Sequence, residues 1–221
     1  MIIELEKDNF FMLDWLDKYL VGHKGFVCGG CFKNIFNNEK VKDVDVFFKS
    51  KADWDEAVMW FDECSVGFGF DYDCLTEETA EYRFFYENSK VKAYKDLKTG
   101  MTVELCRSIF GEPKEIISQF DFTISKFAYY KDEEEPEGDS KVPQLVSKIV
   151  CDEKFFEHLH LKRLVIDDQI PFPMSTFERV LRYVKYGYSP CKETKIKLAK
   201  AINELSEEEI EVSESLYNGV D

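Results

Sequence analysis

The spacing of apolar residues near the start of the chain predicts a helix, a short strand, a second helix and a second strand. Between Asp8 and Tyr19 the apolar side chains recur at intervals typical of an amphipathic helix. Gly25–Cys28 is a short apolar run that ends at a glycine pair. Residues Cys31–Asn38 again show helical spacing, and Val41–Phe48 alternates between apolar and polar residues as a strand does.

The same patterns predict an α+β fold, with a mainly antiparallel or mixed sheet flanked by helices and a short C-terminal helical neck. Three segments describe the expected organisation: a domain over 1–130, an acidic loop or linker over 131–143, and helices over 144–221. The later elements that we expect are helices at Lys51–Cys64 (capped by Asp53), Ser147–Leu164, Ser175–Gly187, Lys192–Leu205 and Glu207–Tyr217, and strands at Val66–Tyr72, Tyr82–Tyr86, Val91–Tyr94 and Gly100–Arg107. Ser175 and Glu178 form the pattern of a capping box at the start of one helix.

Composition narrows the class of protein. The chain has 221 residues, 44% of them hydrophobic, which suffices for a globular core. Seven irregularly spaced cysteines and the lack of a leader pattern predict a soluble, cytoplasmic protein with reduced thiols and no membrane partner. The net charge of −15 disfavours nonspecific nucleic-acid binding, although residues 179–200 are locally basic.

Two carboxylates on the strand Val41–Phe48 are the first candidates for chemistry. Side chains alternate along a strand, so Asp43 and Asp45 point to the same face. Paired hard oxygen ligands suit Mg²⁺ together with nucleotide phosphates. Glu104 alternates in the same way on a later strand, and would supply a third carboxylate if the two strands are neighbours. The amides of Gly29 and Gly30 precede a short helix, a position that favours phosphate.

These residues resemble a known signature. Gly29-Gly30-Cys31-Phe32-Lys33-Asn34, followed by Asp43-Val44-Asp45, is similar to the Gly-Gly-x-x-Arg-Asp and Asp-x-Asp pattern of polymerase-β-like nucleotidyltransferases, especially the head domain of the tRNA CCA-adding and poly(A) polymerase family. The resemblance implies that Asp43, Asp45 and Glu104 bind catalytic Mg²⁺ or Mn²⁺, and that Gly29, Gly30 and Lys33 hold the phosphates. Lys33 replaces the family's arginine, which loses a bidentate contact, and Asn34 replaces an acid.

Weaker resemblances extend beyond the signature. By position, Arg107 matches an arginine of the family's third-carboxylate strand. Asp121-Phe122-Thr123-Ile124 matches a nucleotide-contacting motif, in which Asp121 would bind a ribose hydroxyl or cap a helix, but Gln119 and Phe120 replace its two arginines. Arg179 and Arg182 fall on the two arginines of the family's neck helix, whereas Ser175 and Thr176 stand where the base-reading acids would be.

The resemblance therefore implies an enzyme that transfers a nucleoside monophosphate from an NTP to a hydroxyl acceptor. We favour the 3′ end of tRNA or another RNA, bound through the basic segment 179–200. Two alternatives stay open: nucleotidylation of a protein or small molecule, and an interaction or inhibitor protein that keeps the fold and presents an acidic surface. The sequence specifies neither the NTP, nor the acceptor, nor the oligomeric state.

Overall fold

The structure is a computed structural model, and it describes residues 1–69, 74–134, 144–167 and 170–206. The chain divides into two compact units. Unit 1 comprises Met1–Gln119 and Ser125–Asp152, and unit 2 comprises Phe120–Ile124 and Glu153–Asp221.

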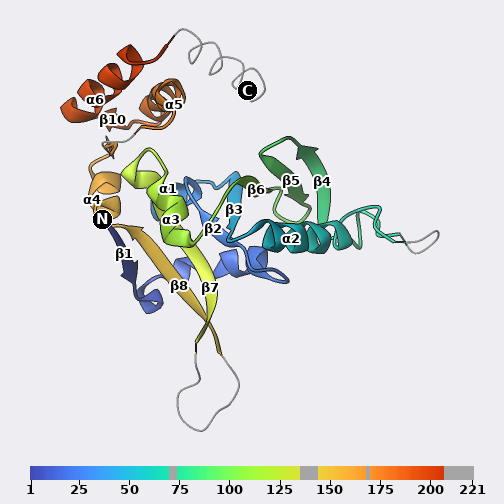
Figure 1. The fold of residues 1–221 in the computed structure, drawn as a ribbon. Helices are drawn as coiled ribbons and strands as arrows, with labels where there is room; N and C mark the ends of the chain where they lie inside the picture. Colours follow the sequence, from blue (N-terminus) through green and yellow to red (C-terminus); the bar gives the residue numbers. More distant parts are fainter. Residues whose placement is uncertain (70–73, 135–143, 168–169, 207–221) are drawn as a thin grey trace. The chain divides into compact units, whose positions relative to one another are not determined.

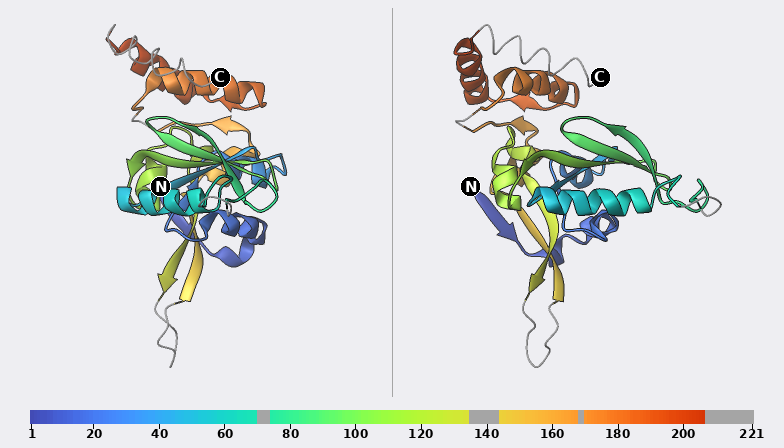
Figure 2. Two further views of the ribbon diagram at one scale, coloured as in Figure 1. Left: turned by 90° about the vertical axis from the view of Figure 1, so that its right-hand side faces the viewer. Right: turned by 45° about the vertical axis from the view of Figure 1, so that its right-hand side comes forward.

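Unit 1 is built on an eight-stranded mixed sheet (Figures 1 and 2). Strands β3 and β6 pair in parallel at its centre, and the other neighbouring strands of the described sheet pair antiparallel. The expected α+β class with a mixed sheet is confirmed. In sheet order the strands are β1 (Ile2–Leu5), β8 (Gln144–Asp152), β7 (Phe127–Glu134), β2 (Phe26–Cys28), β3 (Asp43–Phe48), β6 (Thr102–Phe110), β5 (Val91–Asp96) and β4 (Tyr82–Glu87).

Helix α2 (Lys51–Glu63) covers one face of the β3, β6 and β5 part of this sheet. The indole of Trp54 donates a hydrogen bond to the Leu105 carbonyl at 3.1 Å, which ties the buried side of the helix to β6. Aromatic side chains fill the interface, including Phe61, which stacks on Tyr94 at 5.1 Å between ring centres. The remaining helices of unit 1 are η1 (Lys7–Asn9), η2 (Phe11–Leu20), α1 (Cys31–Phe36) and α3 (Pro113–Ser118).

Unit 2 consists mainly of helices. Its core includes Phe122, Val180 and Tyr183, and the Phe122 and Tyr183 rings lie 5.4 Å apart. The elements are α4 (Phe155–His160), β9 (Arg163–Leu164), α5 (Pro173–Lys185), β10 (Ser189–Pro190) and α6 (Lys192–Asn203), and the short turn η4 (Thr123–Ser125) joins the two units. None of the helices in the described ranges is long and apolar enough to cross a bilayer.

Several predicted elements differ from the observed ones. The helix expected over Ser147–Leu164 forms only at Phe155–His160, as α4. The prediction is wrong up to Asp152, because these residues belong to β8, which pairs with both β7 and β1, and it is wrong again at Arg163–Leu164, which form β9. In place of the amphipathic α-helix expected between Asp8 and Tyr19, the chain forms two 3₁₀ helices, η1 and η2. The strand expected over Val66–Tyr72 does not form at residues 66–69, and its remaining residues, 70–72, lie outside the described residues. The helix expected over Glu207–Tyr217 also lies outside the described residues.

Helix starts were also misplaced. The hydroxyl of Ser50, and not the side chain of Asp53, caps α2 by accepting the Asp53 amide. Helix α5 begins two residues before Ser175, because Pro173 takes the first helical position, where its missing N–H costs nothing. The predicted capping box of α5 does not form.

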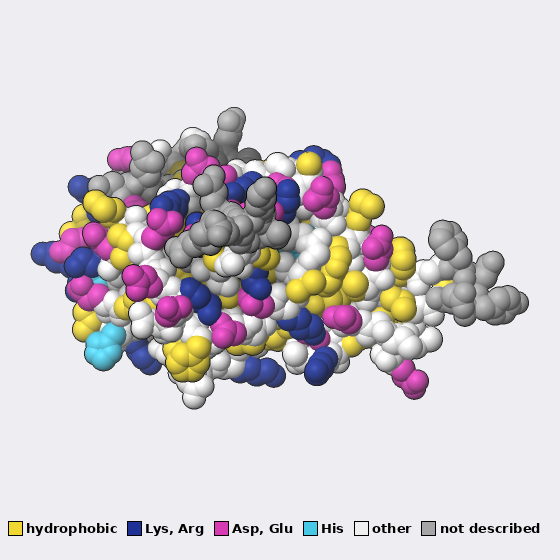
Figure 3. Space-filling view, turned by 90° about the horizontal axis from the view of Figure 1, so that it is seen from below, with side chains coloured by type: hydrophobic (Ala, Val, Ile, Leu, Met, Phe, Trp, Pro, Cys, Tyr) yellow, Lys and Arg dark blue, Asp and Glu magenta, His cyan; other side chains and the backbone are white. Residues whose placement is uncertain are grey.

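One face of the molecule carries charges of both signs. Figure 3 shows Lys and Arg side chains interspersed with Asp and Glu on the face that it displays, around a group of hydrophobic side chains.

Candidate nucleotidyltransferase site

Three carboxylates from two neighbouring strands lie on one face of the sheet. Asp45 lies directly opposite Glu104 in the parallel β3–β6 pair, and Asp43 lies opposite Thr102 one repeat away. Residues two apart on a strand share a face, so all three acids point away from α2. The expected adjacency of the two strands is correct, and it is the register that places Glu104 beside Asp45.

Glu104 sits in an environment that is unfavourable for a lone negative charge. Its partial burial raises the pKa of its carboxyl group, and the negative charge of Asp43 raises it further. The Tyr86 hydroxyl opposes this effect by donating a hydrogen bond to Glu104 Oε1 at 2.8 Å. Crowded carboxylates of this kind are the environment that a bound cation would relieve.

The donor chemistry of this face fits a hard divalent cation, because all three candidate ligands are carboxylates. Within the described part of the chain, however, no three Asp, Glu, His or Cys side chains converge closely enough to hold a metal ion as they stand. Glu104 is turned to Tyr86 in this arrangement. The structure therefore places the candidate ligands on one face without forming a closed metal site.

The turn at Gly29 and Gly30 has fewer backbone amides available to bind phosphate than its sequence indicates. Gly29 has a φ of 94°, which only glycine adopts readily, and its N–H donates to the Phe127 carbonyl at 3.1 Å. This amide is already used by β7, whereas Gly30 forms the N-cap of the short helix α1. Of the two amides expected to bind phosphate, the one at Gly29 is therefore occupied within the fold.

Lys33 lies inside the fold, with 6% of its surface exposed. Its ammonium lies 3.7 Å from a Glu39 carboxylate oxygen and also hydrogen-bonds the Asn34 side chain. Burial lowers the pKa of Lys33, and the charges of Glu39 and Asp43 act in the opposite direction. Asn34, at the position of the family's acid, is thus a direct partner of the lysine that replaces the family's arginine.

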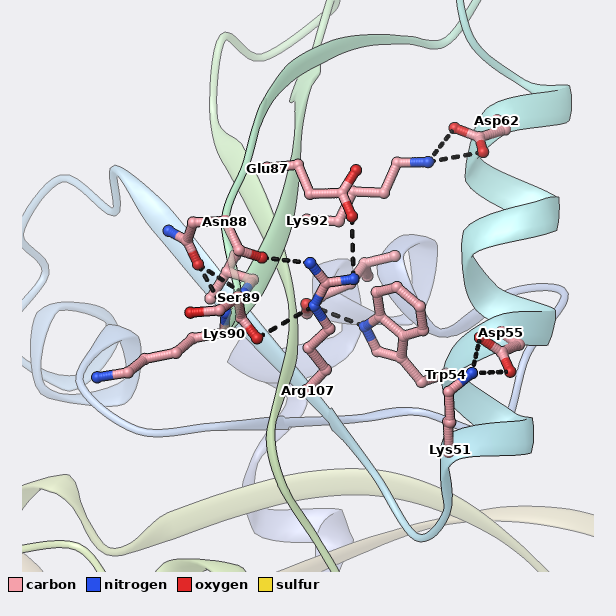
Figure 4. Close-up of polar contacts among 12 residues, drawn as sticks. Lys51, Trp54, Asp55, Asp62, Glu87, Asn88, Ser89, Lys90, Lys92 and Arg107 are labelled. Carbon is pink, nitrogen blue, oxygen red and sulfur yellow. Dashed lines mark hydrogen bonds and ion pairs between the residues drawn. The ribbon is translucent and has the colours of Figure 1, made fainter. Parts of the chain in front are cut away.

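Arg107 is held by the β4–β5 turn and points to the α2 face (Figure 4). It forms an ion pair with Glu87 at 2.9 Å, donates hydrogen bonds to the carbonyls of Asn88 and Ser89, and lies 4.9 Å from the Trp54 ring. Because Arg107 is an odd number of residues from Glu104 on β6, the two side chains point to opposite faces. Its contacts give Arg107 a structural task, pinning the turn to the helix.

The remaining candidates belong to unit 2. The Asp121 carboxylate is nearly buried, accepts the Phe122 amide at 2.8 Å and pairs with Arg179 Nη1 at 3.2 Å. Arg179 also lies over the Phe122 ring at 5.8 Å. These contacts join two positions that sequence reasoning named separately. Arg182 is exposed on α5, and Thr176, at the place of a base-reading acid, is 3% exposed.

Sequence reasoning missed Tyr86 and Lys95, both of which face the carboxylates. Tyr86 bonds Glu104, and Lys95 exerts an attractive charge effect on the same carboxylate. The position of Lys95 could have been predicted from the sequence. Side chains alternate along β5, and the pairing of β5 with β6 places Lys95 opposite Thr102. For Tyr86 the strand alternation was misleading, because an irregularity in β4 changes the face that its side chain reaches.

Comparison with solved structures defines the class of fold. One similar structure is a "tRNA-processing enzyme (apo form I)", with a TM-score of 0.52 and 15% sequence identity. The match covers 92% of this chain and 49% of the enzyme's chain. Another is a tRNA nucleotidyltransferase in complex with a primer tRNA and an incoming ATP analogue, with a TM-score of 0.49 and 16% sequence identity. This match covers 87% of this chain and 50% of the other chain. The fold is that of nucleotidyltransferase-like structures.

The family is narrower than the fold class. Residues 6–162 match the Gabija anti-defense 2 family, and the chain belongs to that family. A curated relative, "Gabija anti-defense 2" of Bacillus phage SPbetaL7, is 23% identical over 209 residues, which cover 93% of this chain and 44% of the relative. The chain thus spans less than half the length of this relative and about half the length of the solved structures.

Proposed function

We propose that this chain is a metal-dependent nucleotidyltransferase that transfers a nucleoside monophosphate from an NTP to a hydroxyl acceptor, and that this activity serves the anti-defense role named by its family. The observation that supports the proposal most strongly is the pairing of Asp45 with Glu104 across β3 and β6, with Asp43 on the same face. Carboxylates placed on one face without a cation are unfavourable, because burial and the negative charge of Asp43 both raise the pKa of Glu104.

Asp43, Asp45 and Glu104 are the residues that would hold Mg²⁺ or Mn²⁺. Bound there, the ions would supply Lewis-acid polarisation of the phosphate and a lowered pKa of the acceptor hydroxyl. The protein's own contribution is positioning: Tyr86 orients Glu104 by a hydrogen bond, and the turn at Gly30 and the nearby Lys33 would face the phosphates. In unit 2, Asp121, Arg179 and Arg182 are proposed to contact the nucleotide.

The acceptor that we favour is an RNA 3′ end. The exposed side chains of Arg182, Lys192, Lys195 and Lys200 give unit 2 the cations that phosphate neutralisation needs. The solved neighbour with the TM-score of 0.52 is a tRNA-processing enzyme, which is consistent with this acceptor class. The replacement of the base-reading acids by Ser175 and by the buried Thr176 argues against ordered C-C-A synthesis.

A second candidate is an inhibitor that keeps the fold without catalysis. Three observations favour it: the family description names an anti-defense protein, the candidate ligands do not converge as a set of three within the described residues, and Lys33 is buried beside Glu39. Under this proposal the acidic surface, with a net charge of −15, would bind the partner in place of a nucleic acid.

A thermal-shift experiment separates the two candidates. With Mg²⁺ or Mn²⁺ and each NTP in turn, the enzyme proposal expects a higher melting temperature for the wild type and no shift for Asp45→Ala. Asp55→Ala is the matched control, because Asp55 is a carboxylate of α2 that pairs with Lys51 on the surface. Equal behaviour of the wild type and Asp45→Ala would favour the inhibitor.

A further inference from the structure

A β-bulge in β4 turns two consecutive aromatic side chains toward the carboxylate face. Phe84 pairs with Tyr94 and Tyr86 pairs with Ala93, so Phe85 is the extra residue of the bulge. Bulges re-aim side chains in this way next to functional sites. The results are the Tyr86 hydrogen bond to Glu104 and a Phe85 ring that lies 4.6 Å from the ammonium of Lys95.

Phe84 provides the contrast that shows what the bulge does. Its ring contacts Tyr94 at 6.4 Å between centres, and the hydroxyl of Tyr94 donates to Asp62 of α2. Phe84 therefore lies on the α2 face, whereas Phe85 lies on the carboxylate face. The two rings are exposed to the same degree, 50% and 51%. Neighbouring and equally exposed phenylalanines thus occupy opposite faces of the sheet.

Lys95 brings a positive charge to the same face. Its ammonium donates to the Thr102 hydroxyl at 2.7 Å, and Thr102 is the residue paired with Asp43. A lysine ammonium has three donors, and the hydrogen bond to Thr102 uses one of them. A cation with remaining donors therefore lies between the exposed Phe85 ring and the carboxylates.

We propose that Phe85 and Lys95 form a nucleotide-binding site on the β4–β5 hairpin, in which Phe85 stacks on a nucleobase and Lys95 contacts a phosphate. Every base has a π-face, so an exposed aromatic ring beside a cation accepts nucleotides with little sequence preference. The inference rests on the proposed function, because it places the nucleotide beside Asp43, Asp45 and Glu104. The nucleotide comes either from the NTP or from the 3′ end of an RNA acceptor.

Calorimetric titration of the full chain in Mg²⁺ tests the site without requiring turnover. The probes are ATP, CTP, GTP and UTP in turn, and a short single-stranded oligoribonucleotide. Phe85→Leu, which keeps the apolar bulk but lacks the aromatic face, and Lys95→Met should each weaken binding about tenfold or more. Phe85→Trp should retain it. Phe84→Leu, the matched control on the opposite face, should bind as the wild type does.

The outcomes identify the ligand or overturn the proposal. If Phe85→Leu and Lys95→Met bind NTPs more weakly than the wild type does, the site belongs to the incoming nucleotide. If the two variants bind only the oligoribonucleotide more weakly, the site belongs to the acceptor. Unchanged binding of every probe by Phe85→Leu and Lys95→Met overturns the inference and leaves the proposed function standing. A wild type that binds none of the probes overturns both. Melting curves of each variant confirm that the fold is intact.

Discussion

The hydroxyl of Tyr86 on β4 donates a hydrogen bond to Glu104 on β6, reaching across the intervening strand β5 at 2.8 Å. The contact links the outermost strand of the sheet to the central carboxylate face. Partners of this kind orient metal-ligating carboxylates, and their removal typically costs ten- to a hundredfold in metal affinity.

Tyr86→Phe should therefore raise the Mg²⁺ concentration needed for half-maximal transfer by about tenfold. Tyr94→Phe is the control, because Tyr94 makes a similar hydrogen bond to Asp62 on the opposite face and should affect stability instead. Titrating Mg²⁺ against the rate of transfer makes the comparison. An unchanged Mg²⁺ requirement in Tyr86→Phe would show that this hydroxyl has no part in positioning Glu104.

The second prediction concerns nucleotide choice. Ser175 and Thr176 provide no carboxylate at the positions of the family's base-reading acids, and Thr176 is buried. The purified protein should add nucleotides to RNA without building an ordered C-C-A end on a tRNA that lacks it. Sequencing of the product reports the result. An ordered C, C, A product would mean that other residues read the base.

The third prediction concerns the acceptor. Reversing Lys192, Lys195 and Lys200 to Glu should abolish RNA binding while NTP binding persists, because these exposed cations supply the phosphate contacts. Wild-type RNA binding should also weaken steeply with salt. Affinity measured over a salt series tests both points. If the triple variant binds RNA normally, the acceptor is held elsewhere or is not RNA.

The fourth prediction concerns acid stability. The Asp96 side chain is fully buried. Burial alone would raise the pKa of Asp96, but hydrogen bonds from Lys18 and Tyr19 outweigh it and lower the pKa from 3.8 to about 2. A depressed pKa stabilises the fold above the unfolded value, and that contribution, roughly 2 kcal/mol, is lost as the pH falls from about 4 through 2.

Asp96→Asn should consequently lower the free energy of unfolding at pH 7, and the gap to the wild type should narrow as the pH falls toward 2. Urea unfolding at a series of pH values measures this gap. A gap that stays constant with pH would show that the loss comes from packing and not from the charge of Asp96.

The parts of this protein that follow from sequence are those set by local pattern. The alternation of side chains along a strand places Asp43 and Asp45 on one face of their strand. The same alternation predicts that Glu104 points to the face of its strand opposite Val103 and Leu105. The pairing that makes them neighbours depends on long-range register, which no local pattern specifies. The helix predicted at Ser147–Asp152 was wrong for a related reason. These residues form a strand because they pair with β1 and β7, which are distant in the sequence.

Two of the residues that the resemblance carried over, Arg107 and Lys33, have partners within the fold. Arg107 matches the family by position, yet the side chain lies against Trp54 on the opposite face from Glu104. Lys33 matches by charge, yet the side chain is buried and its ammonium pairs with Glu39. A motif records which residue stands at a position, whereas partners elsewhere in the chain decide which way the side chain points.

The proposed function requires Asp43 and Asp45 for nucleotidyl transfer. Incubation of purified wild type, Asp45→Ala and Asp55→Ala with Mg²⁺, each labelled NTP in turn and a pool of RNA and protein acceptors tests it most directly. We predict label transfer by the wild type and by Asp55→Ala, and a loss of roughly a thousandfold or more in Asp45→Ala with the fold intact. Equal transfer by wild type and Asp45→Ala, or none by the wild type with any NTP, would overturn the proposed function.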